Sequence, residues 1–147
     1  MFQGAQELNL DAKGRLAVPT RHRDGLQGGG EGKLVLTAHP HGCLVLYPEL
    51  SWMPIRERVM TFPSADPIAS KWKRVLIGYA EELEIDGAGR VLVSPALRKF
   101  AAIDRQVMMI GQGGYFEIWS QDAWQLQLDQ LATAKDQVPT GMENFVL

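Results

Sequence analysis

The chain has 147 residues, of which 46% are hydrophobic and 22% charged, a composition that fits one compact globular unit rather than several large domains. Its formal net charge is −2, so any binding of a polyanion must come from local charge asymmetry. A single cysteine, Cys43, excludes an intrachain disulfide, and without a secretory signal or a long apolar run we expect a soluble cytoplasmic protein.

The first half of the chain is predicted to begin with two short strands joined by a turn. Apolar residues alternate on both sides of this turn with a period of two, which is typical of strands with one buried face: Leu8, Leu10, Leu16 and Val18. Pro19 ends the second strand, and residues 28–32 are predicted to form a mobile, glycine-rich surface loop. Two β-rich runs, "KLVLTA" and "CLVLYP", precede a helical pattern over residues 48–59 that we expect Pro54 to break or to begin.

The second half repeats this order after a helix predicted over residues 66–77. A strand, a turn and a strand follow, with the same alternation of apolar residues: Leu83, Ile85, Val91 and Val93. Ser94 before Pro95 is a good helix start, with serine as the N-cap and proline at the first helical position. The runs "QVMMIG" and "YFEIWS" are predicted strands, a helix is predicted to begin at Ser120, and we expect the tail after Lys135 to be loosely held.

Two parts of the chain are similar enough to indicate a tandem duplication. The stretch "AQELNLDAKGRLAV" aligns without a gap to "AEELEIDGAGRVLV", 75 residues later, and "GCLVLYPELSW" matches "GYFEIWSQDAW", 72 residues later. We therefore predict a first repeat over residues 1–65, a connecting helix over 66–78, and a second repeat over 79–147 that includes a C-terminal helix and the tail. A repeat of this size is marginal as a lone domain, so we expect an α+β fold, mainly β, in which the repeats bury their apolar faces against each other about a pseudo-two-fold axis.

The turn occurs twice, as "DAKGR" and "DGAGR", and its residues divide by what a turn requires. The aspartate can accept hydrogen bonds from backbone N–H groups further along the turn, and the glycine suits a positive φ. The turn-shaping residues are therefore Asp11, Gly14, Asp86 and Gly89. A turn does not require the arginine, whose structural use would be an exposed ion pair worth only about 0–1 kcal/mol. The candidate DNA-binding residues are the basic side chains in and after the two turns: Lys13, Arg15, Arg90, Arg21 and Arg98.

Local charge favours nucleic-acid binding by these turns. Arg15 is predicted to face away from the apolar side of its strand, and a planar guanidinium suits phosphate groups and guanine edges. Residues 11–23 contain four basic residues and one acid, whereas residues 117–147 contain five acids and one base. One such arginine alone could be merely solvated, but the second copy keeps Asp, Gly and Arg. It replaces Lys13 by Ala88, so we expect the first repeat to bind polyanions more strongly than the second.

These motifs resemble the MraZ family, and the resemblance covers essentially the whole chain. It rests on the two "DxxGR" turns, the prolines after them, and the "LVLYP" and "FEIW" strands with their following tryptophans. The resemblance implies an AbrB-like swapped-hairpin barrel with flanking helices. It also implies a nucleoid-associated transcriptional regulator of the division and cell-wall gene cluster. Such a regulator binds short direct repeats of double-stranded DNA in its own promoter and assembles into a homo-oligomeric ring. The family's Asp-x-x-x-Arg positions fall on Asp11, Arg15, Asp86 and Arg90.

Other interpretations of the sequence have less support. His39, His41 and Cys43 stand two apart, as metal ligands can, but no fourth ligand has a recognisable spacing and the intervening proline and glycine indicate a turn. The sequence lacks a phosphate-binding loop, a dinucleotide fingerprint and a convincing nucleophile–base pair, so we expect no enzyme, cofactor or small-molecule substrate. No membrane partner is expected either. The main alternative is a structural, ring-forming assembly protein that acts through protein partners.

Overall fold

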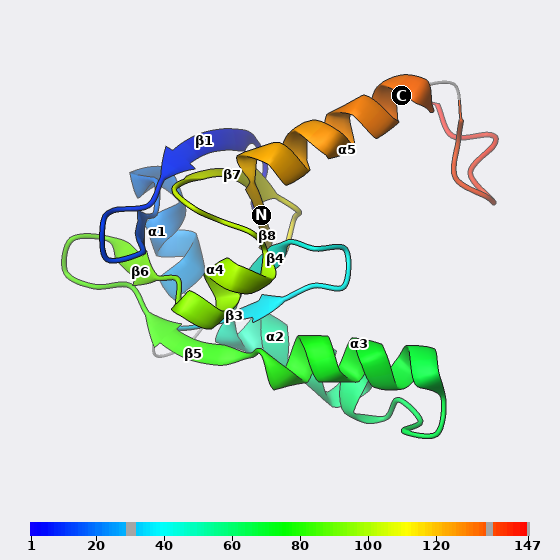
Figure 1. The fold of residues 1–147 in the computed structure, drawn as a ribbon, viewed down its shortest axis with the longest axis horizontal. Coiled ribbons are helices and arrows are strands. Elements are labelled where there is room, and N and C mark those ends of the chain that lie inside the picture. Colours follow the sequence, from blue (N-terminus) through cyan, green and yellow to red (C-terminus); the bar gives the residue numbers. More distant parts are fainter. Residues whose placement is uncertain (29–31, 135–136, 147) are drawn as a thin grey trace.

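The computed structural model describes residues 1–28, 32–134 and 137–146, which form an α+β fold whose main element is a sheet (Figure 1). The strands are β1 (Ala5–Asn9), β2 (Arg15–Ala17), β3 (Lys33–Ala38), β4 (Leu44–Pro48), β5 (Glu81–Glu84), β6 (Arg90–Leu92), β7 (Gln106–Gly111) and β8 (Phe116–Ser120). The helices are α1 (Thr20–Gln27), α2 (Glu49–Met60), α3 (Pro67–Gly78), α4 (Pro95–Phe100) and α5 (Gln121–Thr133). The predicted α+β class, mainly β, is confirmed, and the order β-β-α-β-β-α occurs both before and after α3. Most of the predicted glycine-rich loop, residues 29–31, lies outside the described residues, as does Lys135.

Six strands form one antiparallel sheet in the order β1-β7-β8-β4-β3-β5, and β2 and β6 form a separate two-stranded ribbon. Side chains along each strand point alternately to opposite faces of the sheet. On β3, Leu34 and Leu36 enter the main core, whereas Val35 between them packs against helices on the other face. Strand β3 is therefore covered on both faces, which explains why its sequence is almost continuously apolar.

The main core fills the space between the large sheet and the β2–β6 ribbon. Leu16 and Val91, the central residues of the two ribbon strands, are buried, as are Leu26 of α1 and Leu97 of α4. Each such side chain contributes about 1.5–3 kcal/mol of burial free energy, so apolar residues from both halves of the chain hold the ribbon on the sheet. The apolar pattern does not predict α1, because Leu26 is its one buried residue.

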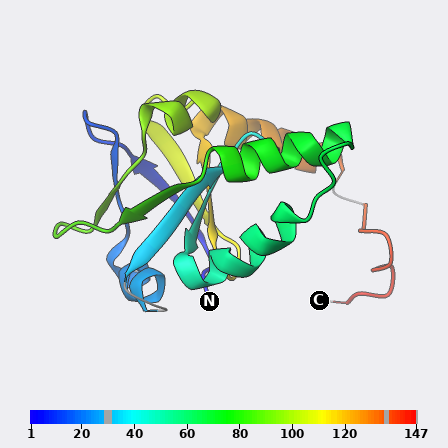
Figure 2. The same ribbon diagram turned by 90° about the horizontal axis from the view of Figure 1, so that it is seen from below.

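The strand, turn and strand predicted at the start of each half are present, but the two strands that flank each turn do not pair with each other. In the large sheet β1 pairs with β7 and β5 with β3, while β2 pairs with β6 in the ribbon. The flanking strands diverge because pairing β2 with β6 places Leu16 opposite Val91 and buries both side chains. The two turns consequently project from the same end of the molecule, at the left of both ribbon views (Figures 1 and 2).

Helices α2 and α3 lie together on the outer face of the sheet (Figure 2). Trp52 and Val59 of α2 and Leu76 of α3 pack around Val35 of β3. The buried hydroxyl of Thr37 on β3 donates a hydrogen bond to the carbonyl of Leu76 at 2.7 Å. This bond fixes the last turns of α3 to the sheet, just before the chain enters β5.

Helix α2 continues through Pro54, contrary to the expectation that it would break or begin there. Proline has no N–H to donate to the carbonyl of Leu50, four residues earlier. Leu50 is 56% exposed, so water can satisfy this carbonyl. Trp52 and Val59, one on each side of the proline, are buried, and their packing holds the helix in place.

The predicted caps of α4 and α5 are confirmed. Ser94 Oγ accepts from the N–H of Leu97 at 3.4 Å, and Ser120 Oγ accepts from the N–H of Ala123 at 3.1 Å. Helix α5 buries none of its side chains fully, and residues 137–146 after it are exposed along their length. Among the described residues, no helix is long and apolar enough to cross a membrane.

Candidate nucleic-acid interface

Two loops project from the β2–β6 ribbon: loop 1 (residues 11–15) and loop 2 (residues 86–90). In loop 1, Asp11 Oδ1 accepts from the backbone N–H groups of Lys13 and Arg15, both at 2.9 Å. The N–H of Gly14 donates to the carbonyl of Asp11 at 3.0 Å, and the N–H of Asp11 donates to the carbonyl of Arg15 at 2.9 Å. Gly14 has a φ of +83°, a conformation that other residues adopt only with strain.

Loop 2 has the same internal geometry. Asp86 Oδ1 accepts from the backbone N–H groups of Ala88 and Arg90, both at 2.9 Å. The N–H of Gly89 donates to the carbonyl of Asp86 at 2.9 Å, and the φ of Gly89 is +78°. In both loops the aspartate and the glycine build the turn, and the arginine leaves it as the first residue of the following strand.

The side chain of each loop arginine donates a hydrogen bond to the aspartate carboxylate of its own loop. Arg15 Nε donates to Asp11 Oδ2 at 2.7 Å, and Arg90 Nε donates to Asp86 Oδ2 at 2.9 Å. Arg90 Nη1 also lies 3.9 Å from Asp11 Oδ2, which links the two loops.

Hydrogen bonds within each loop lower the pKa of both aspartate carboxyl groups and so favour their ionised form. The pKa of Asp11 is lowered to about 2, chiefly by the backbone N–H of Arg15, with smaller contributions from the side chain of Arg15 and the N–H of Lys13. The pKa of Asp86 is likewise lowered, first by the backbone N–H of Arg90. Each arginine therefore faces a full negative charge, which orients its side chain.

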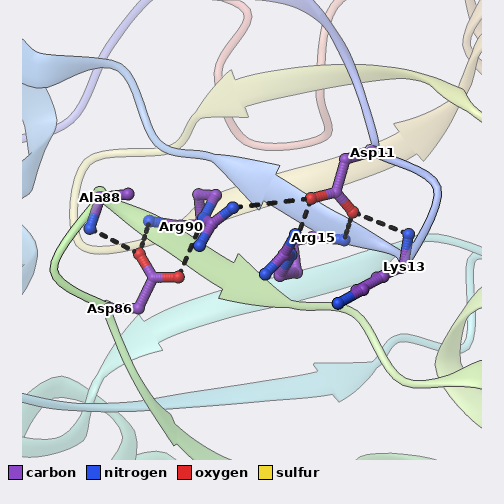
Figure 3. Close-up of polar contacts among 6 residues, drawn as sticks. All are labelled: Asp11, Lys13, Arg15, Asp86, Ala88 and Arg90. Carbon is purple, nitrogen blue, oxygen red and sulfur yellow. Dashed lines mark hydrogen bonds and ion pairs between the residues drawn. The ribbon is translucent and has the colours of Figure 1, made fainter.

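The strand register places Arg15 and Arg90 on the same outward face of the ribbon. In the antiparallel pairing of β2 with β6, Arg15 lies opposite Leu92 and Ala17 lies opposite Arg90. These positions face away from the main core, because the central residue of each strand is buried. Figure 3 shows the two arginines lying between the two loop aspartates. Their side chains are 30% and 33% exposed, so they remain accessible to a ligand.

Loop 1 has more basic neighbours than loop 2. Lys13 is exposed, whereas Ala88 takes its place in loop 2. A groove of about 320 Å³ beside loop 1 is lined by Leu10, Asp11, Ala12, Arg98, Asp104 and Arg105. The N–H of Leu10 donates to the carbonyl of Arg105 at 2.8 Å and so holds this arginine's backbone against the start of loop 1. The sequence analysis missed Arg105, because nothing in its own segment indicates that it lies beside a turn from the other half of the chain.

The remaining candidate arginines have different surroundings. Arg98 Nε donates to the carbonyl of Val93 at 3.0 Å, and Arg23 Nε makes the equivalent bond to Val18 at 2.9 Å. Arg21 lies over β1, where it donates to Gln6 Oε1 at 3.2 Å and to the ring of its neighbour, His22. The structural counterpart of Arg98 is therefore Arg23 and not Arg21. Arg21 and Arg98 are the first basic residues after Pro19 and Pro95, but the offset of 75 residues that relates the two loops pairs Arg98 with Arg23.

The "HPHGC" segment forms the turn between β3 and β4. The N–H of His41 donates to His39 Nδ1 at 3.1 Å, and both imidazole rings lie against Trp72. The thiol of Cys43 is buried on the α5 side of the sheet, where burial and then Glu117 raise its pKa to about 12. Within residues 1–28, 32–134 and 137–146, no three His, Cys, Asp or Glu side chains come together as metal ligands would.

Comparison with known proteins gives the two loops a family context. A family model described as "MraZ protein, putative antitoxin-like" matches residues 1–75 and, a second time, residues 76–142. The chain belongs to the MraZ family. Each match contains one of the two loops, and the boundary between the matches falls within α3.

Several MraZ proteins are similar over their full length. The protein named "Transcriptional regulator MraZ" from Methylobacillus flagellatus is 54% identical over 148 residues, with 100% of both chains covered. Proteins of the same name from Azoarcus sp. and Dechloromonas aromatica are 53% and 51% identical, again over 100% of both chains. This chain is therefore a transcriptional regulator of the MraZ family and not an enzyme.

Proposed function

We propose that this MraZ family member binds double-stranded DNA in a sequence-specific way through the outer end of the β2–β6 ribbon. The observation that carries the proposal is the juxtaposition of Arg15 and Arg90 on one exposed face. The short contacts of both side chains to aspartate use Nε, which leaves Nη donors for phosphate oxygens or for a guanine edge. A two-stranded β-ribbon has a width that the major groove of B-form DNA can admit.

In this proposal the basic residues contribute unequally. Arg15 and Arg90 are the readers, and Lys13 adds a phosphate contact on the loop 1 side only. Arg98 borders the groove beside loop 1, and Arg21 lies over β1, so any contact that they make with DNA is peripheral to the readers. Asp11, Gly14, Asp86 and Gly89 shape the loops and hold the arginines.

The proposed target is a set of short direct repeats in the promoter of the division and cell-wall gene cluster, bound by a homo-oligomeric ring in the cytoplasm at the nucleoid. A single ribbon with few phosphate contacts binds weakly, and several linked ribbons raise the effective concentration of each. Exposed apolar side chains on α2 and α5 support subunit contacts: Leu50, Met53, Met60, Leu126 and Leu131.

The architecture proposed with this function is a swapped-hairpin barrel of two AbrB-like repeats, residues 1–65 and 79–147, joined by a helix at 66–78. The pairing of β2 with β6 and the double match of the family model support it.

The same apolar side chains favour the second candidate function, a ring-forming assembly protein that acts through protein partners. The two candidates differ in what Arg15 does. In the assembly protein, Arg15 would only stabilise its loop, and its removal would leave any binding of promoter DNA unchanged.

The test is a titration of Arg15→Ala by fluorescence anisotropy, against promoter DNA and a scrambled duplex, at several salt concentrations. Loss of a bidentate base contact should weaken promoter binding by about tenfold or more and reduce discrimination against the scrambled duplex. Arg74→Ala is the matched control, because Arg74 is an exposed arginine on α3. That helix extends away from both loops (Figure 2). Unchanged promoter affinity in Arg15→Ala, with light scattering showing the same oligomer, would refute the proposal and favour the assembly protein.

A further inference from the structure

We infer that Arg98 and Arg23 are positioning residues, each of which holds the DNA-binding loop of the other half of the chain in shape. The inference rests on the proposed function, since it concerns how loops 1 and 2 are kept ready for DNA. Neither arginine needs to touch DNA for this role. Three sets of contacts carry the argument.

Backbone hydrogen bonds first join each loop to the opposite half of the chain. The N–H of Val93, at the end of the loop 2 ribbon strand, donates to the carbonyl of Gly14 in loop 1 at 2.9 Å. The N–H of Val18 donates to the carbonyl of Gly89 in loop 2, also at 2.9 Å. The peptide at the glycine of each loop is therefore oriented by a valine from the other half.

The helix arginines then cover the same two glycines. Arg98 donates through Nε to the carbonyl of Val93, and its guanidinium lies over Gly14, where an added Cβ would be only 2.9 Å from Arg98 Cζ. Arg23 donates through Nε to the carbonyl of Val18 and lies still closer to Gly89. Both glycines are buried by these contacts although they belong to exposed loops.

The third set of contacts connects Gly14, covered by Arg98, to Arg15, the proposed DNA-binding arginine. Gly14 immediately precedes Arg15, and the N–H groups of both residues are bonded to Asp11. A change in the peptide at Gly14 would therefore move the N–H and the side chain of Arg15 relative to the carboxylate. In this way Arg98 acts on Arg15 through Gly14, and Arg23 acts on Arg90 through Gly89.

The chemistry of arginine separates this role from direct phosphate contact. A positioning role needs the planar guanidinium, which donates through Nε at a fixed angle while its face covers the glycine. Lysine keeps the positive charge for a phosphate contact, but it has neither the Nε–H nor the flat face. Arg98→Lys therefore removes positioning while it preserves charge.

The experiment uses the full chain and the variants Arg98→Lys, Arg98→Ala and Arg23→Lys, with Arg74→Lys as the control. Amide hydrogen exchange, read residue by residue by NMR without DNA, reports on the loops, and anisotropy reports on promoter affinity. For Arg98→Lys we expect exchange of the Gly14 and Val93 N–H groups to become about tenfold faster, while that of Val18 and Gly89 is unchanged. Arg23→Lys should give the reverse pattern. Promoter affinity of Arg98→Lys should fall as far as that of Arg98→Ala.

Each alternative outcome overturns the inference. If Arg98→Lys keeps both the exchange rates and the affinity of the unaltered protein while Arg98→Ala loses affinity and salt dependence, Arg98 contacts phosphate directly. If both glycines exchange faster in both variants, the arginines contribute only to general stability. If the unaltered protein does not distinguish promoter from scrambled DNA, the proposed function fails, yet the crossed exchange pattern still decides whether the two arginines position the loops.

Discussion

Loop 1 and loop 2 are the same turn in two different surroundings. Inside each loop the aspartate, the glycine and the arginine make matching hydrogen bonds of 2.7–3.0 Å. Outside them the loops differ, since Lys13 and the groove containing Arg105 belong to loop 1, and Arg90 reaches back from loop 2 to Asp11. The shape of each loop is therefore set by its own residues, whereas the charge around it is set by neighbours from both halves of the chain.

The largest predicted effect comes from substituting Gly14 and Gly89, the loop glycines that Arg98 and Arg23 cover. Gly89→Ala should lower the free energy of unfolding by about 1 kcal/mol for the positive φ. It should cost about 0.5–1.5 kcal/mol more because the added Cβ displaces the Arg23 guanidinium from the carbonyl of Val18. Gly42→Ala is the control, because Gly42 also has a positive φ, +97°, but has open space where a Cβ would lie. Gly14→Ala should lie between the two, and urea denaturation measures all three. Equal losses in the three variants would show that the arginines do not constrain the loops.

The charge difference between the loops can be removed or equalised. Lys13→Ala should weaken promoter binding a few-fold and reduce the slope of log K against log salt by about one, because one phosphate contact is lost. Ala88→Lys should raise the slope by about one by giving loop 2 the same lysine. Salt-dependent anisotropy measures both variants. An unchanged slope in Lys13→Ala would mean that loop 1 has no electrostatic advantage over loop 2.

The smallest effect is the separate titration of the two loops. The folded pKa of Asp11, about 2, lies below the ordinary value of 3.8, so its ionised form stabilises the loop. That contribution is fully present above pH 3.8 and is lost as the pH falls through about 2. In carboxyl ¹³C NMR titrations, Arg15→Ala should raise the pKa of Asp11 and leave that of Asp86 nearly unchanged. Equal rises at both aspartates would mean that the loops titrate as one unit.

Much of the local structure follows from the sequence. Alternating leucines and valines predict the strands, and serines before α4 and α5 predict their first turns, because these signals depend on neighbours only a few residues away. The repeated Asp, Gly and Arg also identify the loops, since a tight turn restricts which residues can occupy each position. The MraZ family, the α+β class and the assignment as a transcriptional regulator agree with the sequence analysis.

The pairing of strands does not follow from local signals. Period-two alternation indicates which face of β2 is buried but not which strand lies beside it, and the loop closes its own hydrogen bonds while its flanking strands separate. For the same reason the roles of Arg23 and Arg105 are invisible in their own segments. Each of these arginines depends on residues from the other half of the chain. The pairing of β2 with β6 brings Gly89 to Arg23, and the pairing of β1 with β7 brings Leu10 to Arg105.

The contacts between each loop glycine and an arginine from the other half of the chain also limit which substitutions the protein can accept. Gly14 and Arg98 lie in different halves of the chain, yet the space above the glycine is occupied by the arginine. Gly89 and Arg23 form the reciprocal pair. A substitution at one member of a pair therefore changes which side chains the other member tolerates, so the two halves of the chain are not independent at these positions. Each loop is thus tied to the helix that follows the other loop, whereas Lys13 and Ala88 lie outside these pairs and can differ without disturbing them.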